Sequence, residues 1–192
     1  MPLDAPVATE RPSCADSPSR LFAERWFRNM LQAMVDAGRL ATNARIVQVT
    51  RFDPATRLIE SLAWSGFQEG LPQAAIRMAR KLFPDFDPYR VKPRVDINRC
   101  NEQVYLHGQT VLAPFDEVAL GAVDHRILAV AIAIGKIRRS YLHPLRVDGE
   151  LFGALGFHAQ EIDDDQRRLM DVFVGIAQEL LALALARTSA RA

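Results

Sequence analysis

The sequence predicts an α+β fold in which an antiparallel sheet carries helices on its faces. Two pairs of strand-like runs predict the sheet, because each pair is rich in branched apolar residues and is joined by a short turn sequence. A long helical pattern near each end of the chain supplies the helices. The strand-like runs are Arg45–Phe52, Arg57–Trp64, Tyr141–Val147 and Glu150–His158, and the terminal helical patterns are Ser19–Ala37 and the run from Asp163 to Arg187.

The composition is that of a globular protein with almost no net charge. The 192 residues include 24 Lys and Arg against 23 Asp and Glu, and 49% of them are hydrophobic. A formal net charge of +1 argues against a broad nucleic-acid surface, so no direct nucleic-acid partner is predicted. The two cysteines form no CxxC pair and the histidines form no HxH, HxxxH or HExxH pair, so neither a disulfide framework nor a metal site is predicted.

The length fits one domain. The first 18 residues hold four prolines among Ser, Asp and Ala, and we expect them to form a disordered tail. We place the domain at residues 19–188 and a second short disordered tail at residues 189–192. The longest apolar runs are shorter than the ~20 residues that a membrane span needs. We therefore expect a cytoplasmic protein with no membrane partner.

The first helix is predicted over Ser19–Ala37, with Ser19 as its cap and Gly38 as its end. Its apolar face is predicted from residues at helical spacing, which are Phe22, Trp26, Met30, Ala33 and Ala37. The hairpin that follows turns at Asp53-Pro54-Ala55-Thr56, where the proline supplies the fixed φ of a type I turn.

The middle of the chain is predicted to be irregular. Residues Pro72–Phe83 fit a short helix, and three prolines after it exclude a long element, so we expect a loop up to Asn101. Gly108–Phe115 fits a short strand. The run Glu117–Arg138 fits a helix, and because it is wholly apolar from residue 129 to 134 we expect it to be buried on more than one side.

The second hairpin is the clearest local signal. Its two runs are separated by Asp148-Gly149, the dipeptide best suited to a two-residue type I′ turn. Gly153 and Gly156 lie inside the second run and predict a close approach by another backbone or by a helix.

The last helix is expected to begin after Asp163, whose side chain can cap it. It carries two apolar rows, which are Leu169, Phe173, Ile176, Leu180 and Leu183, and Met170, Ala177, Leu181 and Ala184. One row covers the sheet, and the other then needs a further partner, most simply the same helix of a second subunit. We predict a homodimer whose interface contains Trp26, Met30, Met170, Ala177, Leu181 and Ala184.

The order and spacing of these signals resemble those of a GAF domain. The stretch KIRRSYLHPLRVDGELFGALGF, residues 136–157, is similar to the family's terminal hairpin. There a strand of the form G-[IV]-R-S-x-L-x-x-P-L leads through a D-G turn into x-x-G-x-L-x-F. The matching residues here are Ser140, Pro144, Leu145, Gly149, Gly153, Leu155 and Phe157. The short strand after Gly108 and the acidic start of the last helix also fit the family pattern.

The resemblance implies a GAF/PAS-like antiparallel sheet of roughly six strands. The N- and C-terminal helices then lie on one face, and an irregular helical lid covers a small-molecule pocket on the other. Family members mostly serve as sensory or dimerisation modules in two-component kinases, transcriptional activators and second-messenger enzymes. The resemblance therefore implies a ligand of unknown identity and a separate or fused signalling output module. It names no cofactor, because the family's ligands range from cyclic nucleotides, bilins and haem to nitrate and oxo-acids.

Aromatic side chains gather before and within the irregular middle, at Trp64, Phe67, Phe83, Phe86, Tyr89 and Tyr105. They either line a pocket or fill a satellite core under a long loop, and the sequence leaves both interpretations open. Tyr141 and His143 share one strand face and contact the ligand if that face meets the pocket. The predicted ligand-binding residues are Trp64, Phe83, Tyr89, Cys100, Tyr105, Tyr141 and His143.

Cys100 has three interpretations. Bilin-binding family members usually carry His after the attachment cysteine, whereas Asn101 follows here. Some family members reduce free methionine sulfoxide with thiols near the pocket, and the second thiol of this chain is Cys14 in the predicted tail. The third interpretation is an incidental loop thiol.

The sequence shows no catalytic constellation, and we predict that the chain is not an enzyme. The main hypothesis is a sensory domain that binds a small molecule and signals through a homodimer helix pair. The alternative is a GAF-fold module without a ligand that serves in dimerisation or docking. A thiol-dependent free methionine sulfoxide reductase is a further alternative.

Overall fold

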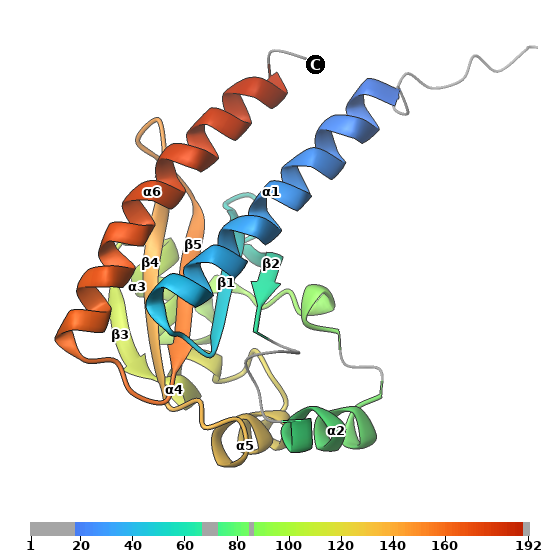
Figure 1. The fold of residues 1–192 in the computed structure, drawn as a ribbon, viewed down its shortest axis with the longest axis vertical. Helices are drawn as coiled ribbons and strands as arrows, with labels where there is room; N and C mark the ends of the chain where they lie inside the picture. The colour runs from blue at the N-terminus through green and yellow to red at the C-terminus, as the bar shows by residue number, and fades with distance from the viewer. Residues whose placement is uncertain (1–17, 67–72, 85–86, 190–192) are drawn as a thin grey trace, which may run out of the picture.

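A five-stranded antiparallel sheet forms the centre of the molecule (Figure 1). The computed structural model describes residues 18–66, 73–84 and 87–189. The strand order is β2-β1-β5-β4-β3, so the two sequence hairpins lie side by side and a fifth strand extends the second. The strands are β1 (Ile46–Asp53), β2 (Leu58–Ser65), β3 (Val111–Pro114), β4 (Arg139–Val147) and β5 (Glu150–Ala159). The predicted α+β class is confirmed, with five strands where about six were implied.

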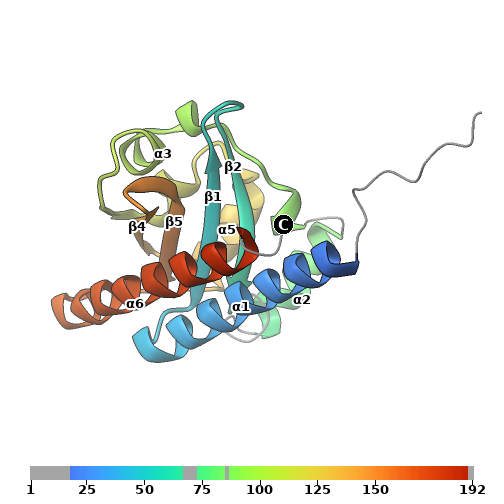
Figure 2. The same cartoon turned by 90° about the horizontal axis from the view of Figure 1, so that it is seen from above.

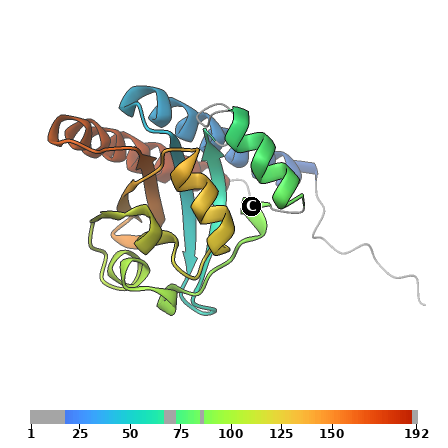
Figure 3. The ribbon, with the colours of Figure 1, turned by 90° about the horizontal axis from the view of Figure 1, so that it is seen from below.

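Two long helices cover one face of the sheet and shorter elements cover the other. The helices are α1 (Pro18–Thr42), α2 (Gln73–Leu82), α3 (Arg99–Tyr105), α4 (Phe115–Ala119), α5 (His125–Ala133) and α6 (Asp164–Ser189), and the 3-10 turns are η2 (Pro88–Arg90) and η3 (Val95–Ile97). Figure 2 shows α1 and α6 side by side across the sheet. Figure 3 shows α2 beside α5 on the far side. The first turns of α1 and the last turns of α6 project together from one end of the molecule.

The main hydrophobic core lies between the sheet and the pair α1 and α6. Side chains of the central strand alternate, so Leu155 and Phe157 point into this core while Ala154 and His158 point to the opposite face. Phe157 meets the ring of Phe173 on α6 edge to face, with ring centroids 6.3 Å apart. A smaller cluster on the opposite face packs η3, α3 and α4 against the sheet.

Both hairpin turns have the conformations that their sequences favour. Asp148 and Gly149 have φ of +51° and +82°, as a type I′ turn requires. In the first turn the carboxylate of Asp53 accepts hydrogen bonds from the backbone N–H of Ala55 at 3.0 Å and from the hydroxyl of Thr56 at 2.6 Å. Arg57 then takes a left-handed φ of +57°, a feature that the sequence did not indicate.

The first helix is longer than predicted, because Gly38 lies inside it. A Cβ at Gly38 would lie 2.7 Å from the ring of Phe173, so the glycine allows α6 to pack closely against α1. The helix ends at Thr42, and Asn43 takes the left-handed φ of +53° that commonly follows a helix. The amide of Gln166 on α6 donates to the carbonyl oxygen of Thr42 at 2.8 Å.

The predicted apolar face of α1 is partly wrong. Ala33 and Ala37 are exposed and Trp26 and Met30 are half-buried. The Phe22 side chain lies outside the described part of the chain. The buried face consists of Ala23, Leu31, Met34, Val35 and Thr42. The buried face is rotated from the predicted one because α1 packs against both the sheet and α6, so two neighbours determine which of its side chains are buried.

The irregular middle contains one helix that was predicted as loop. Residues Arg99–Tyr105 form α3, and the Asn98 side chain caps it by accepting from the backbone N–H of Asn101 at 2.9 Å. The predicted helix over Pro72–Phe83 and strand over Gly108–Phe115 correspond to α2 and β3. Cys100 therefore lies in a helix and not in a loop.

The predicted helix over Glu117–Arg138 is divided in two. Gly121 has a left-handed φ of +75°, and Asp124 begins a new helix by accepting from the backbone N–H of Arg126 at 2.8 Å. No residue of α5 is fully buried, so the expectation of burial on more than one side is wrong. The larger apolar residues of α5 are instead half-buried, in part against α2 (Figure 3), and Ala129 and Ala133 are exposed.

The last helix begins as predicted. The carboxylate of Asp163 accepts from the backbone N–H of Gln166 at 2.7 Å. By length and composition, residues 164–187 are apolar enough to cross a membrane, and one face of this helix is core of the present fold. The ends of α1 and α6 reach residues 18 and 189, and the remainder of the two predicted tails lies outside the described residues.

The predicted dimer residues on α6 are wrong, because their row is already buried within the chain. Met170, Ala177, Leu181 and Ala184 are at most 2% exposed against the sheet and α1. The exposed row corresponds to the other predicted row except at one position, because Phe173 is buried in the core at 9% exposure and Val172 takes its place. Its side chains are between 42% and 68% exposed: Leu169, Val172, Ile176, Leu180 and Leu183. Sequence spacing identified two rows but does not say which one meets the sheet.

The glycines offer a matched test of the fold. A Cβ at Gly153 would lie 2.7 Å from the carbonyl carbon of Thr50 and 2.9 Å from Cα of Arg51, both backbone atoms of the neighbouring strand. We expect Gly153→Ala to lower the free energy of unfolding by about 2–4 kcal/mol. Gly175→Ala on α6 meets no atom within 4 Å and is expected to raise it by about 0.5–1 kcal/mol.

Urea unfolding of the two variants beside the parent protein measures both effects. Equal effects of the two substitutions would contradict the close approach of β1 and β5 at Gly153.

Candidate functional site

A cavity of about 110 Å³ lies between the sheet and the elements that cover its second face. Its floor comes from β1, β2, β4 and β5, and its roof from α3, α4 and the segments that flank them. Seven polar side chains line it, which are Gln48, Thr50, Ser61, Trp64, Asn101, Tyr105 and His158. The remaining wall is apolar. This mixture of apolar wall and a few convergent polar groups is typical of small-molecule sites.

One side of the roof is held by a segment that we call the strap, residues 91–97. The backbone of Ile59 donates to the carbonyl oxygen of Pro93, and that of Val95 donates to the carbonyl oxygen of Arg57, both at 2.9 Å. The strap is thereby attached to the start of β2. Val91 and Pro93 face the cavity from this segment.

The other side of the roof depends on Asn98. Its amide nitrogen donates to the carbonyl oxygens of Val118 and Leu120, each at 3.0 Å, while its amide oxygen caps α3. One side chain therefore joins the beginning of α3 to the end of α4.

Tyr105 ties the roof to the floor. The Tyr105 hydroxyl lies 2.7 Å from the hydroxyl of Thr50, which donates to the carbonyl oxygen of Ala154 at 3.2 Å. With its proton committed in this way, Thr50 accepts from Tyr105. Burial raises the pKa of Tyr105 to about 12, so the phenol stays protonated and keeps donating at physiological pH.

His158 is the most deeply buried polar group of the cavity wall, at 2% exposure. Its Nδ1 lies 2.8 Å from the hydroxyl of Ser140 on the neighbouring strand, and its Nε2 has no hydrogen-bond partner. Burial lowers the pKa of His158 to about 4, so the ring is neutral at pH 7. The ring of Phe115 meets it edge to face, with centroids 5.3 Å apart.

Trp64 supplies the second unpartnered group. A β-bulge at Leu62 places Ser61 opposite Thr50 and Trp64 opposite Gln48, so both side chains face the cavity. The indole Nε1–H is buried and has no acceptor. Its ring lies nearly parallel to that of His158, with centroids 6.5 Å apart. Buried polar groups in native proteins almost always have a partner, so these two nitrogens stand out among the groups of the cavity wall.

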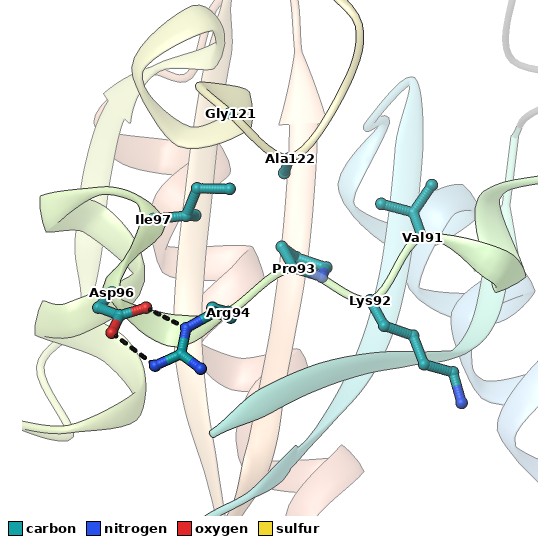
Figure 4. A pocket seen from close by; sticks show the side chains of 8 residues that line it. All are labelled: Val91, Lys92, Pro93, Arg94, Asp96, Ile97, Gly121 and Ala122. Carbon is teal, nitrogen blue, oxygen red and sulfur yellow. Dashed lines mark hydrogen bonds and ion pairs between the residues drawn. The ribbon is translucent and has the colours of Figure 1, made fainter. Parts of the chain in front are cut away.

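An open hollow lies outside the strap and shares Val91, Pro93 and Ala122 with the cavity (Figure 4). It is larger, about 360 Å³, but its charged groups already have partners. Arg94 binds Asp96 through two hydrogen bonds of 3.0 Å, and Lys92 extends away to Glu60 at 2.9 Å. The inner cavity is the better candidate site, because its unpartnered groups are buried.

The structure brings two of the predicted ligand-binding residues to the cavity, Trp64 and Tyr105. Phe83 lies instead under the guanidinium of Arg126, 5.3 Å from its ring centroid, where α2 meets α5. Tyr89 is 44% exposed at the outer edge of β2. The other two aromatics of the predicted cluster, Phe67 and Phe86, lie outside the described residues.

Tyr141 and His143 are on the wrong face for the cavity. Alternation along β4 points Leu142 to the cavity and these two side chains toward α6. The Tyr141 hydroxyl donates to the carboxylate of Asp171 on that helix. Burial, and then this carboxylate, raise the pKa of Tyr141.

Cys100 does not line the cavity. It is buried in the smaller hydrophobic cluster, and burial, followed by the negative charge of Glu117, raises the pKa of its thiol. Cys14 lies outside the described residues. Among the side chains that the structure describes, no group of three His, Cys, Asp or Glu is arranged to hold a metal ion.

Sequence reasoning missed five of the seven polar residues that line the cavity, which are Gln48, Thr50, Ser61, Asn101 and His158. For His158 a signal was present, because it is a polar residue at an inward position of an otherwise apolar strand. Asn101 was missed because α3 was predicted as loop.

The fold is similar to those of solved GAF domains. A GAF domain/HD domain protein from Geobacter sulfurreducens aligns with a TM-score of 0.57 and 12% identity over 86% of this chain and 98% of that one. The blue-light absorbing form of the Thermosynechococcus elongatus PixJ GAF domain aligns with 0.54 and 19% identity, covering 91% and 95%. A type II free methionine-R-sulfoxide reductase from Thermoplasma acidophilum aligns with 0.54 and 10% identity, covering 83% and 94%.

Neither the protein-family models nor the curated proteins contain a match to the sequence. The chain therefore has the GAF fold, shown by structure and not by sequence similarity.

Burial of His158 predicts a pH dependence of stability. The unfolded ring binds a proton below about pH 6.5 and the folded ring only below about pH 4, so the unfolded state binds more protons between these values. The contribution of His158 to the free energy of unfolding has its full value above about pH 6.5, and it falls by about 3 kcal/mol as the pH drops to 4. Urea unfolding measured between pH 7.5 and 5 records most of this fall in the free energy of unfolding. The range stops at pH 5 because the carboxylates titrate below it.

The slope should disappear in His158→Gln and persist in the control His107→Gln, whose side chain is exposed. A slope that survives in His158→Gln would show that another group carries it.

Proposed function

We propose that this chain, with its GAF fold, is a sensory module that binds a small molecule in the cavity and signals through the α1 and α6 helices of a homodimer. The observation that carries the proposal is the pair of unpartnered nitrogens, Trp64 Nε1 and His158 Nε2, in the wall of a cavity. A bound molecule would satisfy groups that the fold leaves without a partner. The solved structures with this fold include domains bound to phycocyanobilin and phycoerythrobilin, which supports ligand binding as the role of the fold.

The cavity wall is connected directly to α1. While the Trp64 indole faces the cavity, its carbonyl oxygen accepts a hydrogen bond of 2.8 Å from the amide of Gln32 on α1. On the next residue of the strand, the hydroxyl of Ser65 accepts from Nε of Arg39 at 3.1 Å. A ligand that moves the end of β2 therefore acts on two points of α1 without an intermediate element.

A second connection joins the sheet to α6. The backbone N–H of Arg146 on β4 donates to the side-chain oxygen of Gln178 at 3.0 Å, and Tyr141 donates to Asp171. Near the projecting end of the pair, the Arg187 guanidinium of α6 lies 5.0 Å from the ring centroid of Trp26 on α1. The two helices are thus joined to each other and to the sheet, and their shared end is the natural output.

The exposed row of α6 supports the homodimer. Leu169, Val172, Ile176, Leu180 and Leu183 form a continuous apolar stripe over four turns of helix. Exposed apolar stripes of this kind mark interaction surfaces, and the same stripe on a second copy provides a symmetric partner. We place the dimer interface on this row in place of the residues predicted from the sequence.

A GAF-fold docking module without a ligand is the alternative, and it would require the cavity to remain empty. A thiol-dependent reductase is the weaker alternative, because Cys100 is buried away from the cavity and its pKa is raised.

Native mass spectrometry of the protein from its own host tests ligand binding. We expect a small additional mass on the wild-type chain. Ala119→Leu fills the cavity from α4 and should abolish this mass, while Ala129→Leu, the same change at an exposed position of α5, should retain it. A mass retained in Ala119→Leu would place the ligand elsewhere, and a wild-type chain without added mass would favour the docking module.

Light scattering tests the helix pair. Leu180→Glu places a carboxylate in the exposed row, so we expect a dimer at micromolar concentration to become a monomer that keeps its fold. Leu120→Glu is the matched control, because Leu120 is 60% exposed on the opposite side of the sheet. A monomeric wild-type protein, or a dimer insensitive to Leu180→Glu, would contradict the interface.

A further inference from the structure

Resting on the proposed function, we propose that the cavity selects an uncharged planar molecule the size of a single six-membered ring, carrying an amide within the ring or attached to it. The inference follows from the size of the cavity, from the absence of charge in its described wall, and from the two unpartnered nitrogens.

The size of the cavity excludes large cofactors. Its volume of about 110 Å³ is somewhat below the roughly 150 Å³ of an engineered protein cavity that takes up one benzene molecule. Typical pockets for drug-sized ligands measure about 300–1,000 Å³. A single ring of six atoms is therefore about the largest group that fits without movement of the roof, and an amide attached to the ring requires the roof to move outward.

The wall offers no charge to an ionic ligand. Among the described residues that line the cavity none is Asp, Glu, Lys or Arg, and His158 is neutral at pH 7. Burying a carboxylate or an ammonium group without a counter-charge costs several kcal/mol in general. The basic residues of the strap do not supply one, because Lys92 and Arg94 are paired with Glu60 and Asp96 outside the cavity. The ligand is therefore uncharged.

The polar groups fit an amide. Trp64 Nε1–H can only donate, so the ligand must present an acceptor to it. His158 Nε2 accepts when Nδ1–H donates to Ser140, and donates when the Ser140 hydroxyl donates to Nδ1. An amide serves both tautomers, because its carbonyl oxygen accepts from Trp64 while its N–H donates to His158, or its carbonyl oxygen accepts from both. A ketone or an ether serves only one.

The ring requirement comes from the neighbouring aromatic groups. The rings of Trp64 and His158 are nearly parallel, inclined by 16°, and Phe115 stands at 72° to the histidine. Flat apolar walls of this kind favour a planar ligand.

The two tryptophans of the chain make the test sharp, because Trp26 lies on α1 and only Trp64 lines the cavity. In Trp26→Phe the fluorescence and the indole N–H resonance both report Trp64 alone. We would titrate this protein with 2-pyridone and nicotinamide, with nicotinate as the anionic analogue, and with toluene as the apolar one. The two amides should bind saturably, at least tenfold more tightly than nicotinate or toluene.

The hydrogen bond itself has a separate readout. The Trp64 indole N–H resonance should move downfield with 2-pyridone and remain in place with toluene. In the otherwise wild-type chain, Trp64→Phe keeps an aromatic ring but removes the donor, and should weaken nicotinamide binding about tenfold by calorimetry. If Trp64→Phe fails to fold, the Trp64 indole N–H resonance of the Trp26→Phe protein still tests the hydrogen bond.

Each failure has a distinct meaning. Nicotinate that binds as tightly as nicotinamide would overturn the requirement for an uncharged ligand, and toluene that binds as tightly as 2-pyridone would overturn the role of the nitrogens. Either result leaves a ligand-binding module in place. If no probe binds while native mass spectrometry detects a ligand that Ala119→Leu removes, the amide class is wrong and the proposed function stands. If neither detects binding, both are overturned.

Discussion

The alternation of side chains along β5 is the constraint on which both faces of the molecule depend. This central strand directs Leu155 and Phe157 into the core under α1 and α6, and Ala154 and His158 toward the cavity. A shift of one residue in its pairing would exchange the two sets, placing a buried imidazole in the apolar core and bulky side chains in the cavity. The close approach at Gly153 opposes such a shift, because a residue with a side chain would collide there with β1. One strand therefore fixes the core and the site together.

The two faces are held by different kinds of interaction. The α1 and α6 face is the larger, continuous apolar core, whereas the roof of the cavity combines a smaller apolar cluster with a few polar contacts: the strap carbonyl of Pro93, the amide of Asn98 and the hydroxyl of Tyr105. Hydrogen bonds of this kind each contribute about 0.5–1.5 kcal/mol to stability, and apolar burial over a whole face contributes more. The roof has the smaller apolar contact with the sheet, so under the proposed function it is the part expected to move when a ligand enters, while the sheet and the long helices stay in place.

The sequence predicted the elements that local rules determine. Asp148-Gly149 forms the type I′ turn, Asp163 caps the last helix, and both hairpins have the expected limits within a residue or two. It failed where tertiary contacts decide. Gly38 lies inside the helix and does not end it, because the Phe173 ring occupies the place where a side chain at this position would be. The row of α6 that meets the sheet depends on how that helix packs on its neighbours. Two of the seven predicted ligand-binding residues, Tyr141 and His143, failed for a related reason: strand alternation gives two faces, and only the fold says which face meets the helices.

Trp64 joins the two halves of the molecule, and its position explains why sequence reasoning reached only part of the site. The bulge at Leu62 turns its indole toward the cavity against the simple alternation of β2, and no local signal marks that bulge. The same residue offers its carbonyl oxygen to Gln32 on α1. The indole N–H of Trp64 has no partner, and the Trp64 carbonyl oxygen is bonded to Gln32 of α1. A ligand that binds the indole would therefore act on a residue that is already attached to α1. Under the proposed function, sensing and output would therefore meet at one position of β2, which the remainder of the fold holds in place.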